Sequence, residues 1–395
     1  MIIREVSEIK RKLIIALTAA FAVLLSGCSG DDVGSVYSLP AQSSSSTTVS
    51  SSSPQSGYPA DESSTEDSGS VESTTSSEPA PITPPDFSIA EETGTFYYSK
   101  DPKNPVTVTF ADDRITVRMK GEDFTRFYQS SPAMNVAQST EDGFSVYTLT
   151  PAENLGSGLG SLVIVDKNNW LGDVYFSMSD GKIKPPDLRP LAEHNQSVYD
   201  SVTNSSEDRI AQAITINGAR DKIPEIWSEI EKISNEICEG IDDDYEKLRA
   251  IADWVSSNIY YDRPATLRGE PPSCLTLEYM LNNRSSVCGG YANMTAALCQ
   301  VQDIRCISIV GKALIDGNNY LNTPLEGGLH EWNVVEIDGR QIIVDSCWMS
   351  TNNLDYTNMY IKNENTWKWF DCGAEIFATD HRAETAEYKD FRSLV

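Results

Sequence analysis

The sequence has few basic residues and few histidines. The shortage of Lys and Arg excludes two classes of partner. The chain holds 31 Lys and Arg residues against 58 Asp and Glu, and only 3 histidines, so its formal net charge is −27. Removal of the N-terminal leader described below, with its two net positive charges, would take this to −29. Such a charge argues against nucleic acid as a partner and against direct adhesion to anionic lipid.

Spacings typical of metal sites are also missing from the sequence. No Cys-x-x-Cys or His-x-x-His pair occurs, which argues against a zinc site. No loop resembles an EF-hand, so calcium dependence is not indicated. No internal repeat is evident. We therefore expect neither a metal nor a cofactor.

Long hydrophobic runs are absent as well. The apolar run Leu13–Leu25 follows a basic start with Arg4 and Lys10, and it is shorter than the roughly 20 residues that span a bilayer. It therefore predicts a signal peptide. Residues 25–28, Leu-Ser-Gly-Cys, resemble the bacterial lipobox, whose cysteine is diacylated and becomes the mature N-terminus. Residues 1–28 would then be a lipoprotein leader with Cys28 as the lipid attachment residue. An ordinary signal peptide with a chance cysteine is the alternative.

Two acyl chains anchor a protein stably, so this reading predicts a bacterial cell-membrane protein that faces outside. Residues 29–93 contain no Lys or Arg and are rich in Ser, Thr, Pro and acidic residues. Such a segment cannot bury enough apolar surface to fold. We expect a disordered linker that holds the folded part away from the membrane.

Residues 94–200 show short runs of alternating polarity separated by turn residues such as Asp142-Gly143 and Asp180-Gly181. This pattern predicts a small antiparallel β domain, similar to a sandwich. Nothing in it carries recognisable chemistry, so a substrate- or wall-binding role and a simple spacer both remain open. A connector is expected from Pro185 to about Ser206.

Residues 205–395 read as helices first and strands afterwards. Ile223–Ile237 and Tyr245–Ile259 have apolar residues at helical spacing, and Leu275–Leu281 predicts a shorter helix. Strand-like runs follow in the last third of the chain. This order is typical of an α+β domain.

A hairpin near residue 338 brings a histidine and an aspartate together. The runs 330–337 and 340–345 are separated by Asp338-Gly339, a strong two-residue turn signal. Continued pairing places Trp332 opposite Asp345 and His330 opposite Cys347. His330 and Asp345 are then diagonal neighbours on one face, about 7–8 Å apart along the backbone, which is within side-chain reach.

A cysteine precedes this hairpin at a predicted helix start. Ser285-Ser286 offers N-cap hydroxyls, and residues 291–298 form a plausible helix body. At a helix N-terminus, Cys288 would lie by N–H groups that favour its thiolate and that could hold an oxyanion. Gly289 would let the substrate approach closely.

These motifs identify a family. Cys-x-Gly-Tyr-Ala from Cys288, His-x-Trp-Asn-x-Val from His330 and the Asp-x-x-Trp motif from Asp345 resemble the transglutaminase-like superfamily, part of the papain-like cysteine enzymes. The resemblance covers residues 241–381 and implies a nucleophile at Cys288, a general base and acid at His330, and an orienting acid at Asp345. It includes His381, for which a structural role is expected. Gly289 and the pair Ser346-Cys347 depart from the residues common in the family.

Five further residues are candidates for the oxyanion site or the pocket wall. They are Tyr260, Tyr261, Gly289, Tyr291 and Trp332. The six cysteines other than Cys28 and Cys288 permit up to three disulfides, and the pairing is left open.

The resemblance implies a cell-surface enzyme that transfers acyl groups from peptide or amide bonds of a protein or peptide substrate. Hydrolysis by a protease or amidase is favoured over cross-linking to an amine. The alternatives are a surface adhesion or assembly module that keeps the fold without turnover, and a structural lipoprotein in which the three residues only pack.

Overall fold

The computed structural model describes residues 94–395 except 121–124, 132, 153–156, 167–168, 270–271, 316–317 and 322–324. The leader, Cys28 and the linker therefore lie outside the described residues. Within the described part, no helix combines the length and the apolar character needed to cross a membrane.

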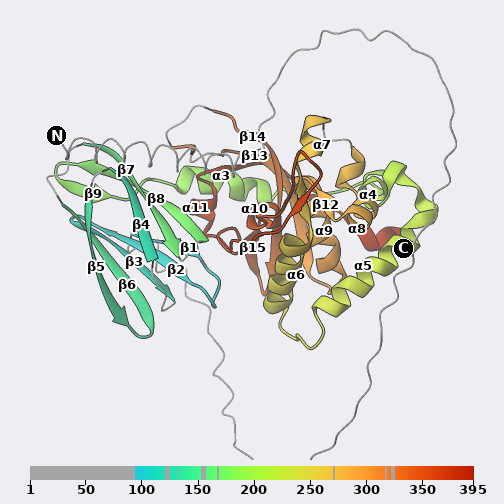
Figure 1. Ribbon diagram of the computed structural model, residues 1–395, viewed down its shortest axis with the longest axis horizontal. Coiled ribbons are helices and arrows are strands. Elements are labelled where there is room, and N and C mark those ends of the chain that lie inside the picture. Colours follow the sequence, from blue (N-terminus) through green and yellow to red (C-terminus); the bar gives the residue numbers. More distant parts are fainter. Residues whose placement is uncertain are drawn as a thin grey trace, which may run out of the picture. The chain divides into compact units, whose positions relative to one another are not determined.

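The protein is a mixed α+β molecule with an antiparallel β region at the start of its described part (Figure 1). Two sheets make up this region, with strand orders β1-β2-β3-β6-β5 and β4-β7-β8-β9. Its strands are β1 Thr95–Ser99, β2 Val106–Ala111, β3 Arg114–Lys120, β4 Thr125–Ser131, β5 Met134–Glu141, β6 Phe144–Pro151, β7 Gly158–Asp166, β8 Asn169–Ser179 and β9 Lys182–Lys184.

Alternation along these strands gives the region its core. Burial along β2 alternates strictly, and Val108 pairs with Val117 of β3, so both side chains face inward. The predicted turn Asp142-Gly143 joins β5 to β6, with positive φ at both residues. Such φ values suit a two-residue hairpin turn.

The rest of the described chain begins with helices and continues with strands, as expected. The helices are α3 Arg189–Tyr199, α4 Glu207–Ile214, α5 Ile223–Ile237, α6 Asp244–Asn258, α7 Arg263–Leu267, α8 Leu277–Asn283, α9 Cys288–Val301, α10 Ser346–Met349 and α11 Ala374–Phe377. Short 3-10 turns occur at residues 216–218, 220–222, 272–275 and 391–394. The predicted bounds of α5 agree with the structure. Helix α6 begins one residue before its predicted start because Asp243 caps it, accepting the Glu246 N–H at 2.9 Å.

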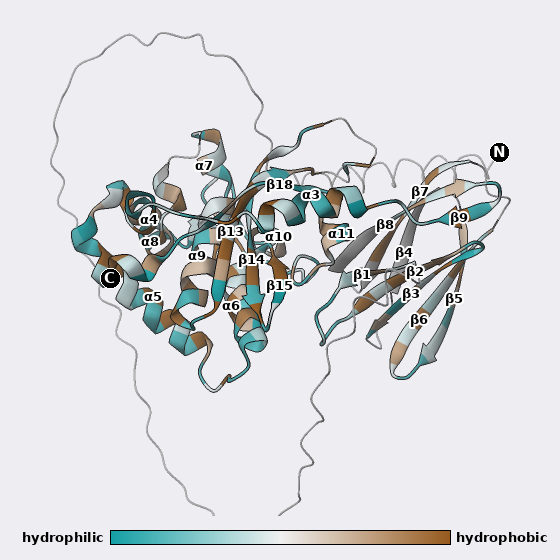
Figure 2. Ribbon diagram, turned by 180° about the vertical axis from the view of Figure 1, so that it is seen from behind, coloured by the Kyte–Doolittle hydropathy of each residue, from teal (hydrophilic) through white to brown (hydrophobic). Residues whose placement is uncertain are grey.

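A five-stranded sheet in the order β10-β18-β13-β14-β15 carries the candidate site. Its strands are β10 Thr203–Asn204, β13 Arg305–Ala313, β14 Gly328–Ile337, β15 Arg340–Val344 and β18 His381–Tyr388. Figure 2 shows hydrophobic stretches along β13, as expected for a central strand. Helix α9 packs against β14, where Asn333 Nδ2 donates to the Ala292 carbonyl at 3.2 Å.

A second, smaller sheet lies next to the start of α9. It has the order β12-β11-β16-β17, formed by β11 Tyr260–Asp262, β12 Ser285–Ser286, β16 Asn353–Leu354 and β17 Tyr360–Ile361. Its strand β12 leads directly into Cys288. This sheet therefore sets where the chain enters α9.

Two local expectations differ from the structure. Ser285 and Ser286 do not cap α9: they pair with Tyr260 and Tyr261, and Ser286 Oγ donates to the Cys274 carbonyl at 2.5 Å. The N-cap of α9 is Val287, without a side-chain hydrogen bond. The expected connector at 185–206 contains α3, and the strands of the β region end at Lys184. Helix α3 packs on β18, where Asn195 donates to the His381 carbonyl and accepts the Ala383 N–H.

Candidate active site

The β14–β15 hairpin has the predicted register over its ordered ladder. Ile337 pairs with Arg340 and Val335 pairs with Ile342, and positive φ values at Asp338 and Gly339 close the turn. The ladder ends at the pair Asn333 and Val344, one residue before Asp345.

Asp345 leaves the strand to cap helix α10. Its Oδ1 accepts the Trp348 N–H at 2.9 Å. Because the chain turns into α10 here, Cys347 lies on that helix and the predicted pairing of Cys347 with His330 is wrong. The position paired with His330 is Gly311 of β13.

His330 and Asp345 nevertheless meet, as the register predicts. The distance from His330 Nε2 to Asp345 Oδ2 is 2.7 Å, and both side chains are fully buried. Because an ionised carboxylate only accepts hydrogen bonds, Nε2–H donates to it, and the neutral ring then carries its lone pair on Nδ1.

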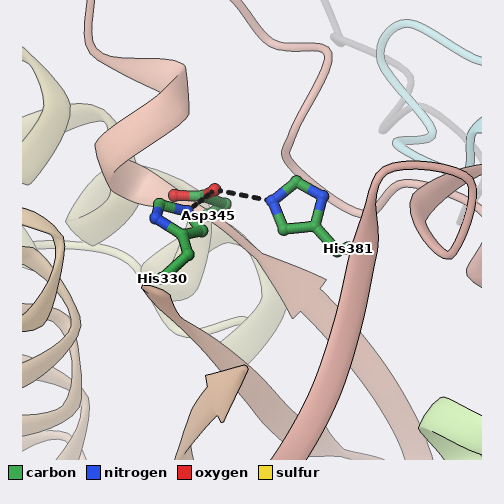
Figure 3. A group of neighbouring side chains, drawn as sticks. All are labelled: His330, Asp345 and His381. Carbon is green, nitrogen blue, oxygen red and sulfur yellow. Dashed lines mark hydrogen bonds and ion pairs between the residues drawn. The ribbon is translucent and has the colours of Figure 1, made fainter. Parts of the chain in front are cut away.

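A second histidine bonds the same carboxylate oxygen. His381 Nε2 lies 3.3 Å from Asp345 Oδ2, and His381 Nδ1 lies 2.7 Å from Asp380 Oδ1. Figure 3 shows Asp345 between the two imidazoles, which come from different strands. Sequence reasoning assigned His381 only a structural role.

The two imidazoles control the charge of Asp345. Burial by itself would raise the pKa of this carboxyl, but the charge of His330 and hydrogen bonds from both rings hold the pKa well below its usual range. Asp345 is therefore an anion at neutral pH, as an orienting acid must be.

Aromatic rings enclose this group on several sides. The His381 ring stacks on Phe377, with centroids 3.9 Å apart, and makes a T-shaped contact with Trp348, with centroids 4.4 Å apart. Trp332, a candidate for the pocket wall, is only 1% exposed and stacks on His330 at 6.1 Å. These rings pack around the two imidazoles, whose side chains are fully buried.

Cys288 occupies the first position of α9. The first turn of this helix lies against β14, because a Cβ added at Gly289 would be 2.8 Å from Glu331 Oε2. Glu331 directly follows His330, so the helix start and the histidine belong to neighbouring segments. The positive end of the helix dipole lies at this position and favours a thiolate.

Exposure distinguishes Cys288 from the other described cysteines. All seven described cysteines are thiols, and Cys288 is the one among them that is partly exposed. Burial raises the pKa of Cys238 to about 11 and that of Cys372 to about 12, so neither favours a thiolate at neutral pH. Because all seven described cysteines are thiols, none of the disulfides that the sequence permits occurs among them.

The three tyrosine candidates differ in their surroundings. Tyr291 is fully buried, and its hydroxyl donates to the Ile259 carbonyl at 2.8 Å, so its visible role is to pack α9. Tyr261 is buried in β11. Tyr260 is half-buried and its ring meets the edge of Tyr360, with centroids 5.0 Å apart.

A buried ion pair, which sequence reasoning did not identify, lies on the α9 side of β14. Lys389 Nζ is 3.0 Å from Glu331 Oε1 and 2.7 Å from Asn293 Oδ1. It therefore joins the segment after β18 to both α9 and β14. Only the fold brings these three segments together, so their spacing in the sequence gives no signal.

The same histidines and aspartate are residue types that also bind metal cations. Ligand atoms of His330, Asp345 and His381 all lie within 4.8 Å of one another. However, a separation of 2.7 Å between His330 Nε2 and the Asp345 oxygen is typical of a direct hydrogen bond. We interpret the group as a hydrogen-bonded network.

One family model matches part of the chain. Residues 231–350 match the model of the transglutaminase-like superfamily. Kyphoscoliosis peptidase from Mus musculus is 27% identical over 162 residues, which are 40% of this chain and 23% of that protein. The Homo sapiens protein of the same name is 26% identical over 125 residues, 31% of this chain and 18% of its own length. The matches thus span less than a quarter of these relatives.

Solved structures also share similarity with this chain. A proposed cysteine protease from Cytophaga hutchinsonii is 15% identical, covers 70% of this chain and 84% of its own, and has a TM-score of 0.26. Red sea bream transglutaminase is 12% identical, covers 71% of this chain and 55% of its own, and has a TM-score of 0.21.

Proposed function

Since residues 231–350 of this chain form a transglutaminase-like domain, we propose that the protein is a cysteine-dependent acyl-transfer enzyme. Cys288 is the nucleophile, His330 the general base and acid, and Asp345 the residue that orients His330. Two observations carry the proposal: the buried 2.7 Å bond between His330 and Asp345, and a partly exposed cysteine at the start of the helix that packs on the strand of His330.

The reaction proceeds in two balanced steps. The Cys288 thiolate attacks a peptide or amide carbonyl, and His330 gives its proton to the departing amine, which leaves a thioester. Water or a second amine then attacks the thioester, His330 takes a proton from this nucleophile, and the Cys288 thiolate leaves, which restores the starting state. Hydrolysis yields an acid, and attack by a lysine amine yields a cross-link.

We favour hydrolysis of a protein or peptide substrate at the bacterial surface. Support for the location comes from the lipobox-like sequence at Cys28 and from the acidic linker that follows it. The protein is then held at the outer side of the membrane by its lipid. Replacing Cys28 by Ser should release it from membranes, and unchanged retention would refute this anchor.

Site-resolved alkylation tests the chemistry. The full chain is treated with iodoacetamide from about pH 5 to 9, and each cysteine is quantified by mass spectrometry. Cys288 should react selectively near the acidic end, and this reactivity should disappear in His330→Ala. His194→Ala is the matched control: this histidine on α3 bonds the Ala383 carbonyl at 2.9 Å and should leave the profile unchanged.

The same experiment decides against the alternatives. Alkylation at Cys288 with an ordinary thiol profile, unaffected by His330→Ala, would indicate a module that keeps the fold without turnover. If Cys288 and His330 form a thiolate–imidazolium pair, a peptide library with added amine donors separates hydrolysis from transfer. Products must be absent with Cys288→Ala in either case.

A further inference from the structure

His381 faces a carboxylate oxygen with each of its two ring nitrogens. Nδ1 lies 2.7 Å from Asp380 Oδ1 and Nε2 lies 3.3 Å from Asp345 Oδ2, while the side chain is fully buried. Such an arrangement constrains which protons the ring can carry.

An ionised carboxylate accepts hydrogen bonds and donates none, whereas a neutral imidazole has one N–H and one bare nitrogen. A neutral His381 would therefore point a lone pair at one of two anions inside the protein. Asp345 already accepts the Trp348 N–H and the His330 N–H, contacts that favour its charged form. Protons on both nitrogens of His381 satisfy all the contacts.

The surroundings of the ring suit a cation. The charged or titratable groups that contact His381 are Asp380 beside it in sequence, Asp345 at the start of α10, and His330 across the sheet at a centroid distance of 5.4 Å. Other elements present aromatic rings, namely Phe377 of α11, Trp348 of α10, Trp332 of β14 and Trp369. Of these, the face of Phe377 stacks on the His381 ring at a centroid distance of 3.9 Å, and an aromatic face stabilises a desolvated cation.

We propose that His381 is a positioning residue held as an imidazolium between Asp380 and Asp345. There it orients Asp345 and weakens the electrostatic attraction of the Asp345 carboxylate for the proton of His330. This role rests on the proposed function. The two imidazoles share one oxygen of Asp345, so the charge of His381 offsets part of the negative charge that His330 experiences. His330 can then release its proton to a leaving amine as well as accept one, and general acid–base catalysis requires both.

Nitrogen NMR of the full chain labelled in histidine tests the charge directly. The chain has 3 histidines, so His194→Gln, His330→Gln and His381→Gln assign every signal. Both ring nitrogens of His381 should be protonated at pH 7 in the wild type. An unprotonated nitrogen at that pH overturns the proposal. A stoichiometric metal ion in the purified protein, whose removal by chelation changes the His381 signal, overturns it too.

Titration of His330 in the same spectra tests the positioning role. In His381→Gln the titration midpoint of His330 should rise by about one to two pH units, because the positive charge of His381 no longer offsets the negative charge of Asp345. His194→Gln is the control and should leave the midpoint unchanged. An unchanged midpoint in folded His381→Gln would mean that His381 is only structural.

Failure of the proposed function has a different signature. If Cys288 shows no selective alkylation at low pH, the acyl-transfer reaction is refuted. The protonation state of His381 and its effect on His330 are still read from the nitrogen spectra, which need neither turnover nor a substrate. The two conclusions are thus tested separately.

Discussion

Replacing Glu331 by Gln should lower the free energy of unfolding by about 2–3 kcal/mol. Glu331 lies 3.0 Å from Lys389, and the two side chains are 16% and 10% exposed. At this distance and an effective dielectric constant of about 20, the gross attraction is about 5.5 kcal/mol. Part of that gain is offset by the cost of desolvating the carboxylate, which Gln avoids. Lys389 also keeps its bond to Asn293 at 2.7 Å.

Glu336→Gln provides the matched control on the same strand. Glu336 bonds Arg305 at 2.9 Å, but these side chains are 39% and 43% exposed, so solvent screens the pair. The expected cost is below about 1 kcal/mol. Urea unfolding of the full chain, followed by tryptophan fluorescence, measures both variants, and the slope with denaturant should stay constant.

A double-mutant cycle isolates the pair itself. The double variant Lys389→Met, Glu331→Gln should lose less free energy of unfolding than the sum of the losses in the two single variants, by at least about 1 kcal/mol. Additivity within about 0.5 kcal/mol would refute a direct interaction. Equal losses from Glu331→Gln and Glu336→Gln would refute the argument from burial.

Three further predictions concern Asp345 and the packing around α9. Asp345→Asn should lower Cys288-dependent turnover by about 10³–10⁴-fold with an unchanged circular dichroism spectrum, and full activity would contradict its orienting role. Folding lowers the pKa of Asp345 from 3.8. Its carboxylate therefore stabilises the protein above that pH, and this contribution is lost as the pH falls further. Between about pH 5 and pH 2, the urea midpoint of Asp345→Asn should decline less than that of the wild type. In Gly290→Ala the new Cβ would lie 1.8 Å from Ser286 Oγ, so thermal unfolding should show a loss of about 2–3 kcal/mol, and a wild-type melting temperature would contradict this packing.

Local features of the site could be predicted from the sequence because they depend on near neighbours. The Asp338-Gly339 turn and the alternation on either side determine the register up to Val344, and hence the approach of His330 to Asp345. Helix α5 could be predicted for the same reason, since its apolar spacing is contained in its own residues.

Features that depend on distant segments could not be predicted. The position of His381 requires the pairing of β13 with β18, and the strand runs carry no signal for that pairing. Ser286 was expected as a cap because its residue type suits one, but the fold brings the Cys274 carbonyl to its hydroxyl. The end of β15 was missed because Asp345 forms a cap where the alternating pattern would continue the strand.

One carboxylate both starts helix α10 and bonds the two imidazoles. A disturbance that frays this four-residue turn must also swing the acceptor away from His330. Insertions or prolines within Ser346–Met349 should therefore disturb the hydrogen bonds of both imidazoles together with the turn itself.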